Sequence, residues 1–217
     1  MSEQHPSTLL TLDQGLALKT AATRLKDEFE ESFGVETIER FLTSSYDQFA
    51  GKATMTNFLP LLAERFARQR LQALARVENK SDDGRPVVLF LCTHNAGRSQ
   101  MALGFFEHYA GDSALAWSGG SEPGNQVNPS AVAAMAERGI DISGEFPKPW
   151  TDEIVQAADV VVTMGCGDAC PIFPGKRYED WELDDPAGKG IDTVRRVRDD
   201  IRGRVENLIG ELLPVSS

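Results

Sequence analysis

The 217-residue sequence contains only three cysteines and three histidines, and its basic residues are outnumbered by acidic ones. Three cysteines do not suit the paired disulfide framework of a secreted domain. The net charge of -11 argues against partners such as nucleic acid or an anionic membrane surface. No apolar run approaches membrane-spanning length, and no secretory signal peptide is recognisable. We therefore expect a protein of the reducing cytoplasm.

The sequence divides into two regions of different pattern. Before Lys80 there is no convincing strand, and apolar residues recur at helical spacing in three stripes, over 18–33, 38–49 and 58–74. We predict a three-helix bundle over residues 1–80, with the aromatic stripes in its core. Any surplus apolar face would serve association, most simply as a homodimer. A polar linker is predicted at 81–85.

Residues 86–217 alternate between apolar runs suited to buried strands and stretches with helical periodicity. The predicted strands are 87–91, 115–118, 159–164 and 177–181, and the predicted helices start near Gln100, Asn128, Thr151 and Thr193. This alternation predicts an α/β fold, a parallel sheet with helices on both faces. In such sheets the chemistry lies outside the carboxyl ends of the strands.

The stretch CTHNAGRS, from Cys92 to Ser99, directly follows the first predicted strand. A thiol at a strand end, a loop of small residues and a helix start together form a nest of backbone N–H groups for an anion. Arg98 adds a planar guanidinium that can hold two oxygens of a tetrahedral anion. The same positive potential and a hydrogen bond from Ser99 stabilise the Cys92 thiolate, so we predict that Cys92 is a nucleophile. The predicted oxyanion-binding residues are Thr93, His94, Asn95, Ala96, Gly97, Arg98 and Ser99.

Two further cysteines, Cys166 and Cys170, follow the third predicted strand, at the same end of the sheet as Cys92. Their segment lacks the last glycine of a dinucleotide-binding fingerprint, and no second ligand pair completes a zinc site, so we predict no metal. One helical turn brings side chains four residues apart onto one face, which makes a relay of thiols with Cys92 chemically possible. The alternative is that both are inert structural cysteines.

An acidic run precedes Pro186. Such a run is most often a solvated turn. Here it follows a predicted strand, so a carboxylic acid at this place could protonate a leaving oxygen. Asp185 is the better candidate, because the following proline restricts its backbone.

Taken together, CTHNAGRSQMA, VNPSAVAAMAERGIDIS, DVVVTMGC, ACPIFP and DDPAGK resemble the thioredoxin-coupled arsenate reductases of the low-molecular-weight protein tyrosine phosphatase superfamily. The resemblance covers 86–213 and implies a four-stranded parallel sheet. It implies that Cys92 attacks arsenate, that Arg98 holds it and that Asp185 is the acid. It further implies that arsenite leaves as a Cys92–Cys166 disulfide forms, and that the disulfide then passes to Cys166–Cys170. The implied external reductant is thioredoxin, with no bound cofactor.

Three features qualify the resemblance. The spacing from Cys166 to Cys170 is shorter than in the family, whose members have a longer flexible segment between these two cysteines. Relatives with a potassium site carry a Glu where this chain has Leu103, so we predict no such ion. The helical region before Lys80 lies outside the minimal domain of the family. One alternative function is a tyrosine phosphatase, which would use only Cys92, Arg98 and Asp185, although Ala187 and Gly188 provide no aromatic wall for a tyrosine ring. A non-enzymatic oxyanion sensor is the other alternative, but a sensor needs no nucleophile.

Overall fold

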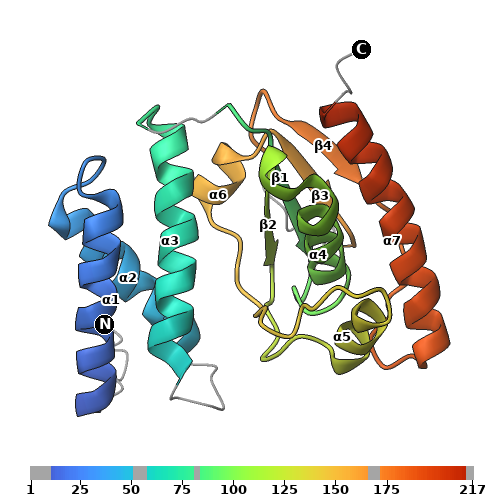
Figure 1. Ribbon diagram of the computed structural model, residues 1–217, viewed down its shortest axis with the longest axis horizontal. Helices are drawn as coiled ribbons and strands as arrows, with labels where there is room; N and C mark the ends of the chain where they lie inside the picture. Colours follow the sequence, from blue (N-terminus) through green and yellow to red (C-terminus); the bar gives the residue numbers. More distant parts are fainter. Residues whose placement is uncertain (1–10, 51–57, 81–83, 166–171, 214–217) are drawn as a thin grey trace, which may run out of the picture. The chain divides into compact units, whose positions relative to one another are not determined.

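The fold was established from a computed structural model (Figure 1) in which residues 11–50, 58–80, 84–165 and 172–213 are described. The chain forms two compact units, residues 1–72 and 73–217. The first is helical, and the second carries the sheet. No helix in the described ranges is both long enough and apolar enough to cross a membrane.

The helical unit is built from α1 (Leu12–Phe29), α2 (Val35–Ala50) and most of α3 (Leu59–Val77), which confirms the three predicted helices. Helix α1 begins earlier than its apolar stripe, because Thr11 and Gln14 form a capping box that satisfies the first backbone N–H groups. The core is apolar and aromatic, with Leu25, Phe29, Ile38, Phe41, Leu42, Phe49, Phe66 and Leu71 all buried.

A buried carboxylate links α1 to α3. The side chain of Glu64 is only 5% exposed, and its oxygens accept hydrogen bonds from Arg24 at 2.8 Å and from Arg68 at 3.1 Å. The hydrogen bond from Arg24 lowers the pKa of the Glu64 carboxyl, although burial acts in the opposite direction. Glu64 therefore stays charged inside the bundle.

One core prediction is wrong. Phe58 was expected in the buried stripe of the third helix, but it is 54% exposed and lies just before α3. The helix and its buried face begin at Leu59, which is 2% exposed.

The second unit contains a four-stranded parallel sheet, as predicted, in the order β2-β1-β3-β4. Its strands are β1 (Val87–Cys92), β2 (Leu115–Gly120), β3 (Val160–Thr163) and β4 (Arg177–Asp180). Strand β1 is buried along its whole length, as its unbroken apolar run indicates. Because β1 lies between β2 and β3, the chain reverses its winding direction there, and the carboxyl end of β1 is the expected place for a ligand.

Helices cover both faces of the sheet (Figure 1). Val88, Phe90 and Cys92 share one cluster with residues of three helices, and the alternation of a strand turns Leu89 and Leu91 to the opposite face. The helices of the first face are α4 (Arg98–Ala110), α5 (Pro129–Ala136) and α7 (Ile191–Leu212), and α6 (Asp152–Ala157) contacts β1 from the other face.

The two edges of the sheet differ. Strand β4 has the sequence RYED and is only partly buried. The apolar strand β2 is covered at its carboxyl end by the segment 148–150, where the Gly120 N–H donates to the Lys148 carbonyl at 3.0 Å.

Candidate active site

Cys92 lies at the carboxyl end of the central strand β1 and is 3% exposed. The loop that follows leads directly into α4, which begins at Arg98. The end of β2 lies against this loop so closely that a Cβ atom on Gly120 would stand 2.7 Å from the Thr93 carbonyl oxygen. Only glycine fits here, because the loop backbone occupies the space of a side chain.

A chain of hydrogen bonds orients the Cys92 thiol. Its Sγ is 3.0 Å from the Ser99 hydroxyl. The Asn95 amide donates to that same hydroxyl at 2.8 Å, so the oxygen of Ser99 accepts from Asn95 and its proton is free to point at Cys92. The Ser99 hydroxyl can therefore donate a hydrogen bond to the Cys92 sulfur, and the N-terminus of α4 adds partial positive charge at the same loop.

Asn95 is held in an unusual backbone conformation, with φ at +46°. Few non-glycine residues adopt this region, and they persist in it only when several contacts fix them. Asn95 is fully buried, and its carbonyl and amide oxygens accept hydrogen bonds from Gln100, at 3.0 and 3.2 Å. The Lys148 backbone N–H donates to the same amide oxygen at 3.0 Å.

The guanidinium of Arg98 lies beside the chain that leaves β3. A Cβ atom on Gly165 would be 2.9 Å from a guanidinium nitrogen, and Gly165 has φ at +75°. The Thr93 hydroxyl donates to the Gly165 carbonyl at 2.9 Å. The segments after β1 and β3 therefore meet at Arg98, as the parallel sheet predicts.

Asp185 faces the same arginine. Its carboxylate is 3.6 Å from an Arg98 nitrogen, and its side chain is 59% exposed. A cavity of about 50 Å³ lies between the loop and the segment after β4. Its lining residues are Cys92, His94, Ala96, Gly97, Arg98, Asn128, Asp185, Pro186 and Ala187. The nucleophile, the cation and the acid named from the sequence thus share one small cavity.

The other residues named from the sequence lie around this cavity or outside the described ranges. Asn95 and Ser99 are buried and support the loop, while Thr93 is tied to Gly165. Cys166 and Cys170, the two further thiols of the predicted relay, lie outside the described residues. Within the described ranges, no group of three or more His, Cys, Asp or Glu side chains is placed to hold a metal ion.

Several residues of the site were not identified from the sequence. Asn128 signals only a helix start, and it does cap α5 by accepting from the Ser130 N–H, but it also lines the cavity. Gln100 and Lys148 carry no sequence signal, because their importance depends on burial against Asn95.

Comparison with known proteins settles the family. Residues 87–214 match the family described as low molecular weight phosphotyrosine protein phosphatase. The chain belongs to this family. Residues 18–75 match a second family, described as the protein-tyrosine-phosphatase-like N-terminal domain. Both the recognised superfamily and the added helical region are therefore confirmed.

Relatives of this phosphatase-family chain include named arsenate reductases. Arsenate reductase 2 of Staphylococcus epidermidis is 44% identical over 124 residues, which cover 55% of this chain and 93% of the relative. A protein of Synechocystis named glutaredoxin arsenate reductase is 39% identical over 128 residues, or 58% of this chain and 97% of the relative. The solved structure of a thioredoxin-dependent arsenate reductase from Corynebacterium glutamicum is 43% identical with a TM-score of 0.81, and the match covers 90% of this chain and 96% of that one.

Proposed function

We propose that this chain reduces arsenate to arsenite and takes its electrons from thioredoxin. The observation that carries the proposal is the shared cavity of Cys92, Arg98 and Asp185, in a chain whose relatives are named arsenate reductases. A volume of about 50 Å³ suits a small inorganic oxyanion better than a peptide side chain with its backbone. Arg98 supplies a positive charge inside the cavity, beside the carboxyl group of Asp185, although the whole chain carries a net charge of -11.

The first step is a substitution at arsenic. The Cys92 thiolate attacks the As(V) atom, and a sulfur–arsenic bond forms while an arsenic–oxygen bond breaks. Asp185 in its acid form gives its proton to that oxygen, which leaves as water, and Asp185 is left as a carboxylate. Arg98 and the N-terminus of α4 stabilise the negative charge of the remaining oxygens.

The second step is the reduction. Cys166 as a thiolate attacks Sγ of Cys92, a disulfide forms, and the electron pair of the sulfur–arsenic bond stays on arsenic, which leaves as arsenite. Cys170 then attacks Cys166, which frees Cys92 and moves the disulfide to Cys166–Cys170. Thioredoxin supplies two electrons that reduce this disulfide. Gly165 immediately precedes Cys166 in the sequence and lies against Arg98, which supports Cys166 as the resolving thiol.

The test is arsenate-dependent NADPH oxidation with purified thioredoxin and thioredoxin reductase, run in parallel with glutathione and glutaredoxin. Both reductants occur in the names of relatives, so the two arms distinguish them. Turnover with thioredoxin alone supports the proposal, and turnover only with glutaredoxin contradicts its reductant. Hydrolysis of p-nitrophenyl phosphate without arsenate reduction would favour the phosphatase alternative.

Single-turnover mass spectrometry tests the relay. Cys166→Ser should retain arsenic on Cys92, whereas Cys170→Ser should release one equivalent of arsenite and keep a Cys92–Cys166 disulfide. Full thioredoxin-coupled turnover in Cys170→Ser would show that only Cys92 and Cys166 take part in the relay. Because free thiols must stay reduced for this cycle, we place the reaction in the cytoplasm.

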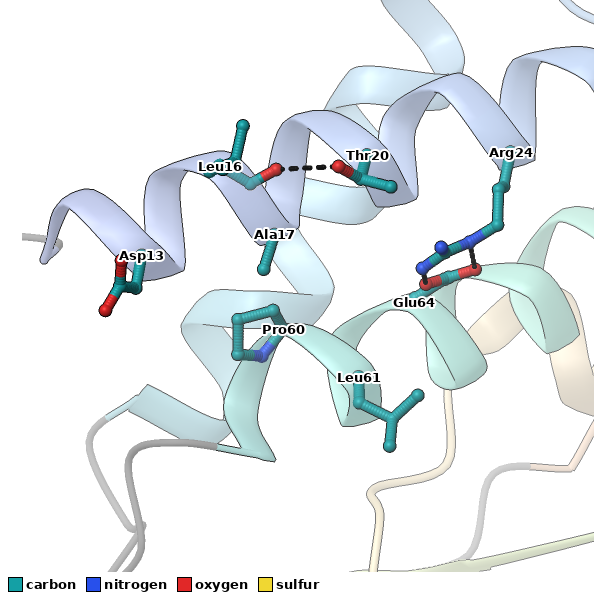
Figure 2. Close-up of a pocket in the computed structure, with 8 residues that line it drawn as sticks. All are labelled: Asp13, Leu16, Ala17, Thr20, Arg24, Pro60, Leu61 and Glu64. Atoms are coloured by element: carbon teal, nitrogen blue, oxygen red, sulfur yellow. Dashed lines mark hydrogen bonds and ion pairs between the residues drawn. The ribbon is translucent and has the colours of Figure 1, made fainter.

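We further propose that the helical unit joins two copies of the chain. A groove of about 450 Å³ lies between α1 and α3. Figure 2 shows Ala17 facing Pro60 in it. Leu16 and Leu61 belong to its lining and are 67% and 52% exposed. Asp13 and Arg24 also line this groove, and they lie toward opposite ends of α1. In an antiparallel, twofold pairing of two α1 helices, Asp13 of one copy lies beside Arg24 of the other, whose guanidinium also binds Glu64 of its own chain, so the charged ends of the two helices match.

Analytical ultracentrifugation at micromolar concentration tests this association. Leu16→Glu and Leu61→Glu should convert a dimer to a monomer, because each places a charge in the apolar groove. Val35→Glu is the matched control, since Val35 is also an exposed apolar residue of this unit, at 45%, but does not line the groove. A monomeric wild-type chain, or a dimer that survives both groove substitutions, contradicts the proposal.

A further inference from the structure

The side chain of Lys148 is fully buried, which is rare for a lysine. Its ammonium lies 3.4 Å from a carboxylate oxygen of Glu145 and 3.4 Å from the Phe146 carbonyl oxygen, and 4.6 Å from the centre of the Phe146 ring. Burying a charge is costly, and an apolar side chain of the same length is often as stabilising or more so. Stability alone therefore does not account for this charge.

A series of hydrogen bonds connects the surroundings of Lys148 to Asn95, which supports Cys92 through Ser99. The Phe146 carbonyl oxygen accepts from the Lys148 ammonium and also from the Gln100 amide, at 3.2 Å. That amide also donates to both oxygens of Asn95. The Lys148 backbone N–H reaches the Asn95 side chain directly, at 3.0 Å.

We propose that Lys148 is a positioning residue for Cys92, a role that rests on the proposed function of Cys92 as nucleophile. The ammonium holds the 145–148 segment in place, and this segment and Gln100 hold Asn95 at its positive φ. Asn95 in turn directs the Ser99 proton to the Cys92 sulfur. Without the ammonium, Asn95 is free to relax toward an ordinary backbone conformation, and Ser99 loses the partner that orients its hydroxyl.

The test measures the reactivity of Cys92 itself. In the full chain carrying Cys166→Ser and Cys170→Ser, Cys92 is the only thiol, and its alkylation by iodoacetamide can be followed against pH. The charged or titratable groups that share its cavity are Arg98, His94 and Asp185, and all remain in every variant. Inorganic phosphate is the probe for the anion site, through its protection of Cys92 from alkylation.

We expect Lys148→Met to keep the wild-type unfolding temperature or to raise it. Alkylation near pH 7 should become about tenfold slower, with its profile displaced to higher pH, and phosphate protection should weaken. Lys176→Met is the control, because Lys176 lines a separate pocket beside Asp159 at the amino end of β3. It should match wild type in all three measurements.

Several outcomes overturn the proposal. An unchanged alkylation profile in Lys148→Met does so, whether or not the unfolding temperature falls. If Lys148→Met fails to fold, Glu145→Gln decides, since it removes the anionic partner of the ammonium and should shift the profile in the same direction; no shift overturns the proposal. None of these measurements uses arsenate, so their failure is distinguishable from a failure to reduce arsenate.

Discussion

The two units place their buried polar groups and their exposed apolar groups in opposite ways. In the sheet unit most of the buried polar side chains gather around one loop, and these are Asn95, Arg98, Ser99, Gln100 and Lys148, whereas Ser118 lies in β2 and Arg198 in α7. In the helical unit the buried charge of Glu64 is matched by two arginines. Large exposed apolar side chains show the reverse distribution, with Leu12, Leu16, Val35, Phe58 and Leu61 in the helical unit and only Tyr109 and Ile172 among the described residues of the other.

This difference agrees with the proposed division between chemistry in the sheet unit and association through the helical unit. Polar groups that are held rigidly in a dry site stabilise a developing charge without reorganising, so the sheet unit has the character of a reaction centre. Apolar residues left on a helical surface contribute binding energy only when another surface covers them. Substitutions in each unit test this division.

The largest effect is expected for Cys92→Ser. Serine keeps the shape of the site, but its hydroxyl does not ionise near neutral pH, so no sulfur–arsenic bond forms. Turnover of arsenate should be undetectable in the thioredoxin-coupled assay, while the circular dichroism spectrum stays that of wild type. Measurable arsenite production by this variant would show that Cys92 is not the nucleophile.

Asp185→Asn should lower kcat about 100-fold, because general acid catalysis contributes a factor of this order or more. The amide keeps the size of the side chain but has no proton to give to the leaving oxygen. Asp184→Asn, one residue earlier and also exposed, is the control and should stay close to wild type. Equal losses in both variants would point to a general charge effect instead of proton donation.

Glu64→Ala should lower the free energy of unfolding by about 2 kcal/mol, since hydrogen bonds to charged groups are worth about that much. The matched control is Glu28→Ala, whose carboxylate is 38% exposed and bonds Arg68, and it should cost under about 1 kcal/mol. Urea unfolding followed by circular dichroism measures both. Arsenate turnover should be unchanged, and a large loss of turnover would show that the two units do not divide stability from chemistry.

Gly165→Ala should lower kcat/KM about tenfold. An added methyl group strains the positive φ, at a cost on the order of 1–3 kcal/mol, and meets the Arg98 guanidinium. Gly175→Ala separates the two causes, because Gly175 also has a positive φ, +80°, but open space around it. If Gly175→Ala impairs turnover equally, backbone strain and not the position of Arg98 explains the loss.

The smallest effect concerns acid stability. Hydrogen bonds from Arg195 and then Arg198 lower the pKa of Glu137 from 4.5 to about 2. A lowered carboxyl pKa stabilises the folded state above pH 4.5, and this contribution is lost as the pH falls from 4.5 toward 2. The unfolding temperature of wild type should therefore exceed that of Glu137→Gln at neutral pH, and the gap should shrink on acidification. A gap independent of pH would assign the effect to packing.

The sequence predicts the elements of the sheet unit well because β1 and β3 are unbroken apolar runs and the segments between them have clear caps. It also predicts Cys92, Arg98 and Asp185 as candidates. Cys92 ends a buried strand, Arg98 begins the helix after the loop, and Asp185 stands directly before Pro186. It does not predict the burial of Lys148, because a lysine between two prolines is ordinarily solvated, and only the folded chain shows its contacts with Phe146, Glu145 and Asn95. The exposure of Phe58 was missed for a similar reason, since periodicity does not show where a helix begins.

The two unlike edges of the sheet bear on how the protein behaves at high concentration. An open, apolar edge strand is a template on which a neighbouring molecule can add its own strand, and it promotes aggregation. Here β4 is four residues long and carries Arg177, Glu179 and Asp180, while the carboxyl end of the apolar strand β2 is already paired with the chain at 148–150. The charged residues of β4 disfavour pairing at that edge, and the 148–150 segment already pairs with part of β2. The fold therefore disfavours strand pairing between molecules.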